Sequence, residues 1–442
     1  MKRLIETLKN IWKIEDLRKR ILTTLGLLLV YRLGAHVVLP GIDPTKLQAL
    51  SDQTAGGVLG LLDMFSGGAF SNASVMALGI MPYISASIVI QLLGIAIPYF
   101  QRLQREGESG RRKMNQITRY LTVAILILQS PAYLANLSAT LPADAFIISG
   151  TLFKVTSVVI LTAGTMFVMW IGEKITDRGI GNGISLIIMV GIVARLPFAF
   201  VAEFISRVEE QGGGLVIFLV EMIMLAAVII LAILLVQGTR KVPVTYAKRI
   251  VGNKQYGGVR QYIPLKINAS GVMPIIFAQA LMFIPVMILG FSSSEAATGF
   301  AAAFTDYTSV AYNVVFALLI IGFTYFYTAI TINPTQMAED LKRNGGFIPG
   351  VKPGKKTAEF IDTIMSRITL PGSLFLALIA ILPAFAAAAG VSTGFAQFYG
   401  GTSLLILVGV CLDTLQQIDS HLMMRHYDGI LKSGRIKGRR SA

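Results

Sequence analysis

Residues 79–84 read Gly-Ile-Met-Pro-Tyr-Ile, and residues 271–276 read Gly-Val-Met-Pro-Ile-Ile. The two copies lie in the second and the seventh of ten long apolar runs, where a duplication of five spans would place them. Because five is odd, the second copy would enter a membrane from the opposite side, as in inverted-repeat proteins. The proline in each copy removes a backbone donor and predicts a kink in each helix. The pattern predicts a 5+5 inverted repeat, with chance similarity of glycine- and isoleucine-rich helices as the alternative.

The composition of the chain requires a membrane. Of its 442 residues, 54% are hydrophobic and only 14% are charged, whereas soluble domains have about 45–50% and about 25%. One cysteine, Cys411, excludes an intramolecular disulfide. Ten runs have the length of about 20 residues that a spanning helix needs. They lie near 21–39, 73–97, 119–137, 150–172, 183–201, 215–236, 269–291, 310–332, 370–389 and 397–418.

Basic residues alternate between the two sides of these runs. The N-terminus, four connections and the C-terminal tail hold 34 of the 39 Lys and Arg residues, while the other five connections hold only Lys46 and Arg207. Cytoplasmic loops carry such an excess because positive charge resists translocation. We therefore expect an all-α polytopic membrane protein with both termini in the cytoplasm. Apolar residues at helical spacing within 1–20 predict an amphipathic surface helix there, with a solvated basic tail as the alternative.

An apolar stretch of about 15 residues, 56–70, is too short to cross a bilayer. Glycine pairs at both of its ends mark it as a separate piece. It would lie on the external side, just before the second span. Two interpretations stay open from the residues alone: a re-entrant half-helix that fills a central cavity, or a helix at the external membrane interface.

The spans contain little that could do chemistry. The ionisable residues within them are Arg32, Lys154, Arg195, Glu221 and Asp413, and each lies close enough to a span end for its charged group to reach the interface. The three histidines have no metal-ligand spacing, and no nucleotide loop or nucleophile–base set is present. We expect no cofactor and no enzyme activity. A channel for polypeptides and a secondary transporter for small solutes remain nearly equal from composition and spacing, and sparse intramembrane charge argues against the transporter.

Several polar residues lie in or next to the second and seventh spans. Polar side chains in spans usually form hydrogen bonds between helices. A sharper hypothesis is a seam where the two helices meet and can separate. The residues are Ser85, Ser87, Gln91, Asn268, Ser270 and Gln279.

Two long connections, 237–268 and 333–369, are basic. Individual residues there could serve only as topology signals or lipid contacts. Loops of this length are often functional, so we expect a docking platform for an acidic or phosphate-rich partner.

Long stretches of the chain resemble the SecY family, the channel-forming subunits of the bacterial Sec protein translocase. They occur in the family's order over nearly the whole chain. These stretches are MFSGGAFSNASVMALGIMPYISASIVIQLL (64–93), EGESGRRK (106–113), TRYLT (118–122), GTMFVMWIGEKITDRGIGNGISLII (164–188), PVTYAKR (243–249), PLKINASGVMPIIFA (264–278), FIPGVKPGKKTAEFID (347–362) and FYGGTSLLILV (398–408).

The resemblance implies two halves, 21–201 and 202–418, hinged around an hourglass pore, with a basic tail at 419–442. It implies a lateral gate at the seam defined above, and a plug at about 58–72, including Leu61, Leu62, Met64, Phe65, Ser66, Gly67 and Gly68. A ring of aliphatic side chains would seal the pore: Ile80, Ile84, Ile188, Ile276 and Ile406. The expected docking residues are Arg240, Lys241, Lys248, Arg249, Lys352, Lys355 and Lys356.

The implied partners are the SecE and SecG subunits, the motor ATPase SecA, ribosomes, signal sequences with their nascent chains, and lipid of the bacterial cytoplasmic membrane. Lys352 departs from the family pattern, which commonly has arginine in that loop. Lysine keeps the charge but lacks the planar fork of donors that a bidentate contact needs.

Overall fold

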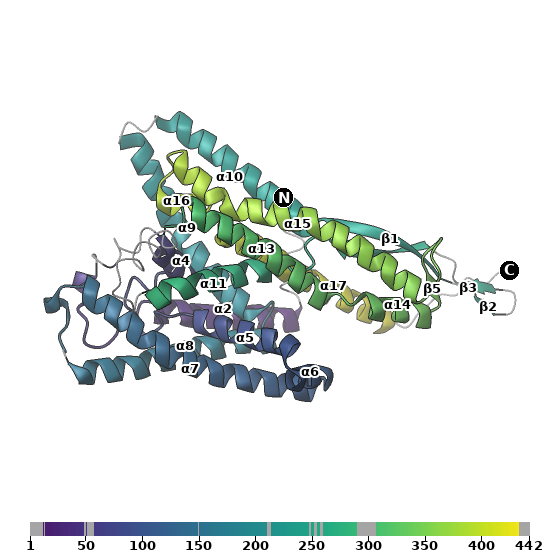
Figure 1. The fold of residues 1–442 in the computed structure, drawn as a ribbon, viewed down its shortest axis with the longest axis horizontal. Coiled ribbons are helices and arrows are strands. Elements are labelled where there is room, and N and C mark those ends of the chain that lie inside the picture. Colours follow the sequence, from purple (N-terminus) through teal and green to yellow (C-terminus); the bar gives the residue numbers. More distant parts are fainter. Residues whose placement is uncertain are drawn as a thin grey trace.

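The computed structural model describes residues 12, 14–47, 50, 57–148, 150–209, 214–246, 249–251, 254–256, 260–289 and 306–432. Long helices dominate this part of the chain (Figure 1). Its α-helices are α2 (Glu15–Gly34), α4 (Gly57–Ser66), α5 (Met81–Ala96), α6 (Pro98–Arg105), α7 (Glu108–Thr140), α8 (Thr151–Arg178), α9 (Gly183–Glu209), α10 (Gly214–Gln237), α11 (Met273–Leu289), α13 (Val310–Thr331), α14 (Pro334–Arg343), α15 (Lys355–Ala388), α16 (Thr393–Ala396) and α17 (Gly401–Lys432). Short 3-10 helices are η1 (Pro44–Lys46) and η2 (Ala143–Ala145).

Among the described residues, seven helices are long and apolar enough to cross a membrane, or eight if the pair α5–α6, bent by 103°, forms one span. The chain is thus a multi-pass membrane protein. Helices α2 and α11 lie where the first and seventh spans are expected, but neither meets this standard alone. Basic residues occupy the start of α2, and α11 has 17 residues.

The helical ends differ from the prediction in two ways. Helices α7 and α15 begin well before the expected starts at 119 and 370, so they extend beyond the apolar runs. Helix α5 begins at Met81 rather than near 73, because residues 67–80 form successive turns. Residues 1–11 of the predicted N-terminal amphipathic helix and residues 433–442 of the predicted basic tail lie outside the described residues. The earlier part of that tail, 419–432, continues helix α17.

The predicted proline kinks are wrong. Pro82 and Pro274 each occupy the second position of their helix, α5 and α11. An amide at the start of a helix has no intrahelical acceptor, so proline costs nothing there and its fixed φ favours helix initiation. The two prolines start helices instead of bending them.

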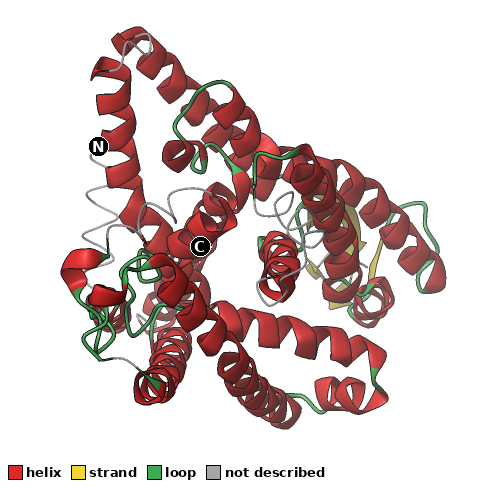
Figure 2. Ribbon diagram, turned by 60° about the vertical axis from the view of Figure 1, so that its left-hand side comes forward, coloured by secondary structure: helices red, strands yellow, loops and turns green. Residues whose placement is uncertain are grey.

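The prediction of an all-α chain is also incomplete, because the two basic connections form strands (Figure 2). Strand β1 pairs antiparallel with β4 along its length and with β5 at its end, where Thr245 lies opposite Phe347. The three-stranded sheet therefore joins 237–268 to 333–369 over a small core that includes Val244, Leu265 and Ile361. The strands are β1 (Thr239–Tyr246), β2 (Arg249–Val251), β3 (Lys254–Tyr256), β4 (Arg260–Lys266) and β5 (Gly346–Phe347).

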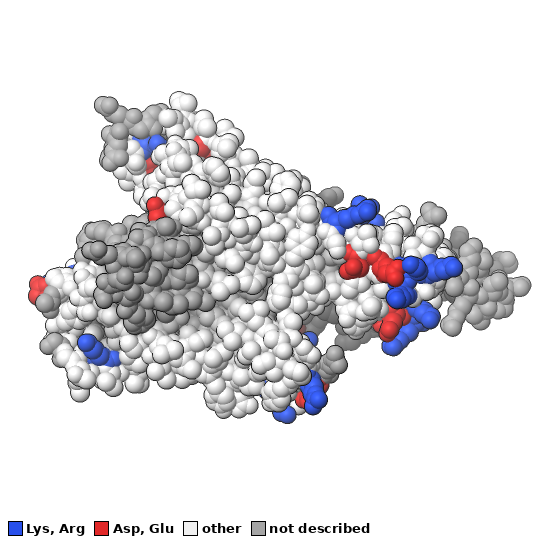
Figure 3. Space-filling model, in the orientation of Figure 1, with Lys and Arg blue, Asp and Glu red and all other residues white. Residues whose placement is uncertain are grey.

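Charge is distributed as a membrane protein requires. On the face in Figure 3, charged side chains gather at the end that carries the sheet, and the middle of the molecule is almost free of them. Large apolar side chains of that middle region face outward, such as Ile223 of α10, which is 69% exposed. Exposure on this scale fits contact with lipid rather than water.

Candidate functional site

All five predicted ring residues lie in one buried apolar cluster at the centre of the molecule. Their side chains come from the start of α5, from α9, from α11 and from α17, and none is more than 7% exposed. Four separate elements thus contribute isoleucine to one packed cluster. The ring comprises Ile80, Ile84, Ile188, Ile276 and Ile406.

The two sequence copies build the same local structure. Gly79 and Gly271 both adopt left-handed backbone conformations, with φ of 53° and 63°, which glycine enters at low steric cost. Two residues after each glycine a helix begins with Met-Pro. The first turn closes in both, from the Ile84 amide to the Ile80 carbonyl (3.1 Å) and from the Ile276 amide to the Val272 carbonyl (3.3 Å). Ile84 and Ile276 therefore occupy equivalent positions, one turn into their helices.

The predicted plug segment is buried. Helix α4 covers 57–66, and Met64 and Phe65 pack in the same cluster as the isoleucines, each 5% exposed. An interfacial helix would leave one face exposed, yet residues 63–71 of this segment are all buried. Leu61 and Leu62 lie within α4, but their side chains fall outside the described residues.

Helices α2 and α9 both contact the backbone at the end of α4 and in the turns after it. The Tyr31 hydroxyl donates to the Ser66 carbonyl (3.1 Å), and the Arg32 guanidinium donates to the Gly67 carbonyl. On the other side, a Cβ atom on Gly191 of α9 would lie 2.9 Å from the Phe65 carbonyl oxygen. Only glycine at this position allows α9 to approach the segment so closely. Gly67 and Gly68 both have positive φ, which forms the tight turn.

A buried ion pair joins the same segment to α9. The Asp63 carboxylate is 5% exposed and pairs with the Arg195 guanidinium. Its other oxygen accepts from the Ser71 amide (2.8 Å), and Arg195 also donates to the Ser71 hydroxyl (2.7 Å). Sequence analysis placed Arg195 near a span end with its charge reaching the interface, and that interpretation missed this pair. The one signal for it was an isolated carboxylate within an apolar segment.

A second ionic cluster lies where α9, α10 and the turn before α16 meet. Arg207 binds Glu203 (2.9 Å) and Glu221 (2.6 Å) and donates to the Gly390 carbonyl (2.6 Å). Glu203 in turn accepts from the Ser392 amide (3.1 Å). The cluster thus ties together the end of α9 and the start of α10 on either side of their connection.

One hydrogen bond crosses the predicted gate. Gln91 of α5 accepts from the Tyr327 hydroxyl of α13 (3.1 Å) and donates to the Ser87 hydroxyl (3.2 Å). Tyr327 also packs edge-to-face on Phe277 of α11, with ring centroids 5.4 Å apart. Ser85 is partly buried on α5. Tyr327 was not among the predicted residues.

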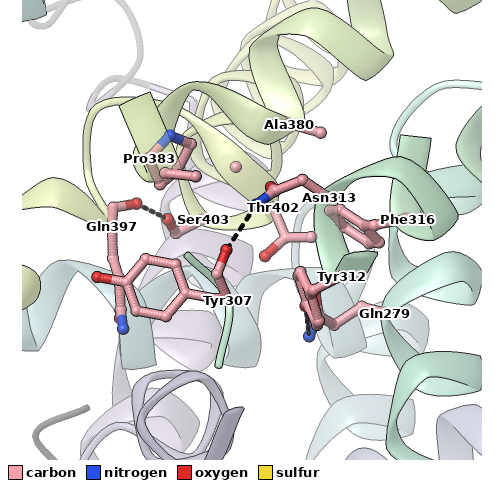
Figure 4. A pocket seen from close by; sticks show the side chains of 12 residues that line it. Gln279, Tyr307, Tyr312, Asn313, Phe316, Ala380, Pro383, Gln397, Thr402 and Ser403 are labelled. Carbon is pink, nitrogen blue, oxygen red and sulfur yellow. Dashed lines mark hydrogen bonds between the residues drawn. The ribbon is translucent and has the colours of Figure 1, made fainter. Parts of the chain in front are cut away.

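Asn268 and Gln279 lie apart from that hydrogen bond. Asn268 is buried in the turns before α11 and accepts a hydrogen bond from the Ser270 hydroxyl (3.2 Å). Asn268 and Ser270 both precede the helix, which begins at Met273. Gln279 donates to the Tyr312 hydroxyl (3.4 Å) inside the C-terminal half. It lines a cavity of about 30 Å³, shown in Figure 4, with room for about one water molecule among Asn313, Thr402 and other side chains.

The predicted docking lysines are exposed at the sheet end of the molecule. Lys241 lies on β1, and Lys352 precedes α15, whose first turn holds Lys355 and Lys356. Cations are unfavourable at the positive end of a helix dipole, so local stability does not explain these two lysines. The hydrogen bond from Lys356 to Glu359 (2.8 Å) raises the pKa of the lysine and lowers that of the glutamate. Lys248 falls outside the described residues, as does the side chain of Arg249.

Comparison with known proteins decides the family. The SecY family model matches residues 74–415. The chain belongs to the SecY family. It is 43% identical over 433 residues to protein translocase subunit SecY of Streptomyces coelicolor, covering 95% of this chain and 98% of that protein. SecY of Mycobacterium tuberculosis strain H37Rv is likewise 43% identical, over 439 residues. As a SecY family member, the chain is a transport protein, a subunit of a protein translocase, rather than an enzyme.

Solved structures show the same fold. A protein-conducting channel aligns with a TM-score of 0.62 and 17% identity, covering 95% of each chain. Sec61 in a canine ribosome–channel complex aligns with a TM-score of 0.57 and 16% identity. The expected SecY channel fold is thus confirmed at the level of architecture.

Removing the charge of Asp63 should release the end of α4 together with the turns that follow it. Asp63→Asn keeps the acceptor for Ser71 but leaves Arg195 without its counter-ion, and breaking a buried pair costs about 3–5 kcal/mol. Arg195 is 34% exposed, which lowers the expected cost to about 2–3 kcal/mol. In a Cys411→Ser, Met64→Cys background, labelling of the new thiol by maleimide should accelerate roughly 30- to 150-fold.

Asp144→Asn is the matched control, because it breaks an exposed pair with Lys46. Exposed pairs contribute little, so this control should leave the labelling rate within about twofold of its parent. Equal labelling rates in the Asp63 variant and the control would show that the ion pair does not hold the segment.

Proposed function

We propose that this chain forms the protein-conducting channel of a bacterial Sec translocase in the cytoplasmic membrane. Unfolded polypeptides would pass through the isoleucine ring, and hydrophobic segments would leave sideways into lipid. The observation that carries the proposal is the convergence of five isoleucines with Met64 and Phe65 of α4 in one buried cluster. A narrow apolar constriction excludes ions by dewetting, and flexible side chains can close around a passing chain.

The finer architecture belongs to the same proposal. Ten spans would form two inverted halves of five, 21–201 and 202–418, around an hourglass pore, with both termini cytoplasmic. The equivalent starts of α5 and α11 support the repeat. The Arg207 cluster supports a hinge between the halves, since it binds elements on both sides of the α9–α10 connection. Residues 58–72 would act as a plug that adds a second seal.

The lateral gate would open where α5 faces α11 and α13. A signal sequence would insert there because its apolar surface gains about 25 cal/mol per Å² on reaching lipid. The Tyr327–Gln91 hydrogen bond opposes this opening, since it joins the two sides. Among the predicted seam residues, Ser87 and Gln91 take part in this contact.

The three-stranded sheet would be the docking platform for SecA and for ribosomes, with Lys241, Lys352, Lys355 and Lys356 in contact. Such a motor or ribosome must supply the energy, because the sequence contains no nucleotide-binding motif. SecE and SecG would complete the complex. Arg240, also predicted for docking, lies on the opposite face of β1 from Lys241, so it stands apart from this set.

Photocrosslinking during insertion of a stalled secretory chain tests the channel. Photoreactive residues at Ile84 and Ile276 should both crosslink to the nascent chain, because these positions lie at the constriction. The same probe at Ile223, on the exposed face of α10, should not. Absence of crosslinks in a preparation that translocates would move the path elsewhere. A preparation that does not translocate would next be assayed for uptake of small solutes.

Tyr327→Phe should ease gate opening. It removes only the hydroxyl that binds Gln91, and such a bond contributes about 0.5–1.5 kcal/mol. Translocation of a precursor with a weakened signal sequence should therefore rise about two- to tenfold. Tyr325→Phe, on an exposed part of the same helix, is the control and should change nothing. A Tyr327 variant that behaves like this control would remove the hydrogen bond from the gate mechanism.

Reversing the charge of Lys352 should weaken docking. Lys352→Glu should lower the affinity of SecA for the reconstituted complex about tenfold at low salt, and the difference should shrink as ionic strength rises. Lys352→Arg should bind at least as well as lysine. Lys113→Glu on α7 changes charge outside the sheet and controls for net charge. If it matched the Lys352→Glu loss, net charge rather than the platform would explain docking.

A further inference from the structure

Arg240 and Lys241 are neighbours on β1, but they face opposite sides of the sheet. Side chains alternate along a strand, so Arg240 shares a face with Val242 and Val244, which are 3% and 0% exposed. Its partner across the ladder, Leu265, is also buried. This is the face that packs on α15. Arg240 therefore lies at one end of a row directed toward that helix.

Between Arg240 and α15 lies a cavity of about 220 Å³. Its lining residues include two arginines, Arg240 and Arg367, together with a threonine and apolar residues. The other lining residues are Phe360, Thr363, Ile364 and Ile368.

No carboxylate lines this cavity, and neither arginine forms a hydrogen bond or ion pair with any described residue. Two like charges around one cavity repel each other unless an anion lies between them. Guanidinium groups offer paired donors that match the oxygens of a phosphate. The cavity thus has the positive charge and the type of donor that suit a phosphate.

The surface below the cavity is suited to acyl chains. Beyond Arg367, α15 exposes Leu370, Leu374 and Leu378, each more than 50% exposed and spaced by three or four residues. This spacing places them on one stripe that continues from Arg367 into the membrane-spanning part of the helix. In Figure 3, basic side chains gather where the uncharged middle region ends. A headgroup site at this level would continue directly into an apolar surface.

We propose that the cavity between β1 and α15 binds the phosphate of an anionic phospholipid, held by Arg240 and Arg367, with the acyl chains on the leucine stripe. The site is independent of the channel path, and it lies on the opposite face of β1 from Lys241. A free phosphate shares the headgroup chemistry but makes no use of the stripe.

Native mass spectrometry of the detergent-purified translocase complex tests the site, with phosphatidylglycerol and phosphatidylcholine as probes. The wild-type complex should retain phosphatidylglycerol in preference to phosphatidylcholine. Arg240→Gln combined with Arg367→Gln should weaken that retention at least about tenfold. Lys241→Gln combined with Lys266→Gln removes the same charge from the other face and should leave retention within about twofold.

Equal retention of phosphatidylglycerol by the arginine double variant, or equal retention of phosphatidylcholine by the wild type, would overturn the proposal. Displacement of the lipid by inorganic phosphate at about 10 mM would assign the site to a free anion instead. Arg367→Lys serves if the double variant does not assemble: it keeps the charge, loses the fork and should lower retention about threefold. Unchanged retention in that variant would likewise overturn the bidentate assignment. Because the readout is lipid binding, the result does not depend on whether the complex translocates.

Discussion

The central constraint on this molecule is that a path through a membrane must be closed by packing of side chains alone, with no covalent step. In the proposed channel, the contact that closes this path is apolar packing between side chains of α4, α5, α9, α11 and α17. Because this packing is non-directional, it can be broken and re-formed as elements separate. It also requires that every element reach the same point, which fixes where α5, α9, α11 and α17 cross. The glycine turns before α5 and α11 determine where these two helices begin. Each turn thereby places an isoleucine, Ile84 or Ile276, one turn into its helix and in the cluster.

The segment that fills the centre is irregular after Ser66, and irregular backbone survives at membrane depth only inside protein. Its polar groups are accordingly satisfied by neighbours: carbonyls by Tyr31 and Arg32, and an amide by Asp63. Asp63 then needs its own counter-ion, which Arg195 supplies. A buried pair adds little net stability compared with apolar packing, but it permits few alternative positions. Apolar packing thus closes the centre, while the polar contacts define one location for the segment.

Much of this arrangement could be predicted from sequence, and the failures have physical causes. The repeat located Ile84 and Ile276 because their position depends on local turns that each copy encodes. The proline kinks were wrong because proline inside a helix and proline at its start look alike in an apolar run, and only the preceding glycine separates them. The pair of Asp63 and Arg195 joins residues 132 positions apart, so no local pattern records it. The strands are hard to predict because charged residues interrupt them, and only Val242 and Val244 show the alternation of a half-buried strand.

The sheet and the gate are connected through a short stretch of chain. Helix α13, which carries Tyr327, ends at Thr331, and α14 begins at Pro334 and packs with the sheet over the core that contains Val244. Tyr327 therefore lies about one turn before the end of the helix that leads into the docking region. A partner that docks on the sheet, as proposed above, would act close to the helix whose Tyr327 hydroxyl binds Gln91. Since both basic connections contribute strands to one sheet, such a partner would contact one paired unit rather than two separate loops. In the proposed mechanism, a partner on the cytoplasmic side could therefore affect the Tyr327–Gln91 hydrogen bond through the short connection between α13 and α14.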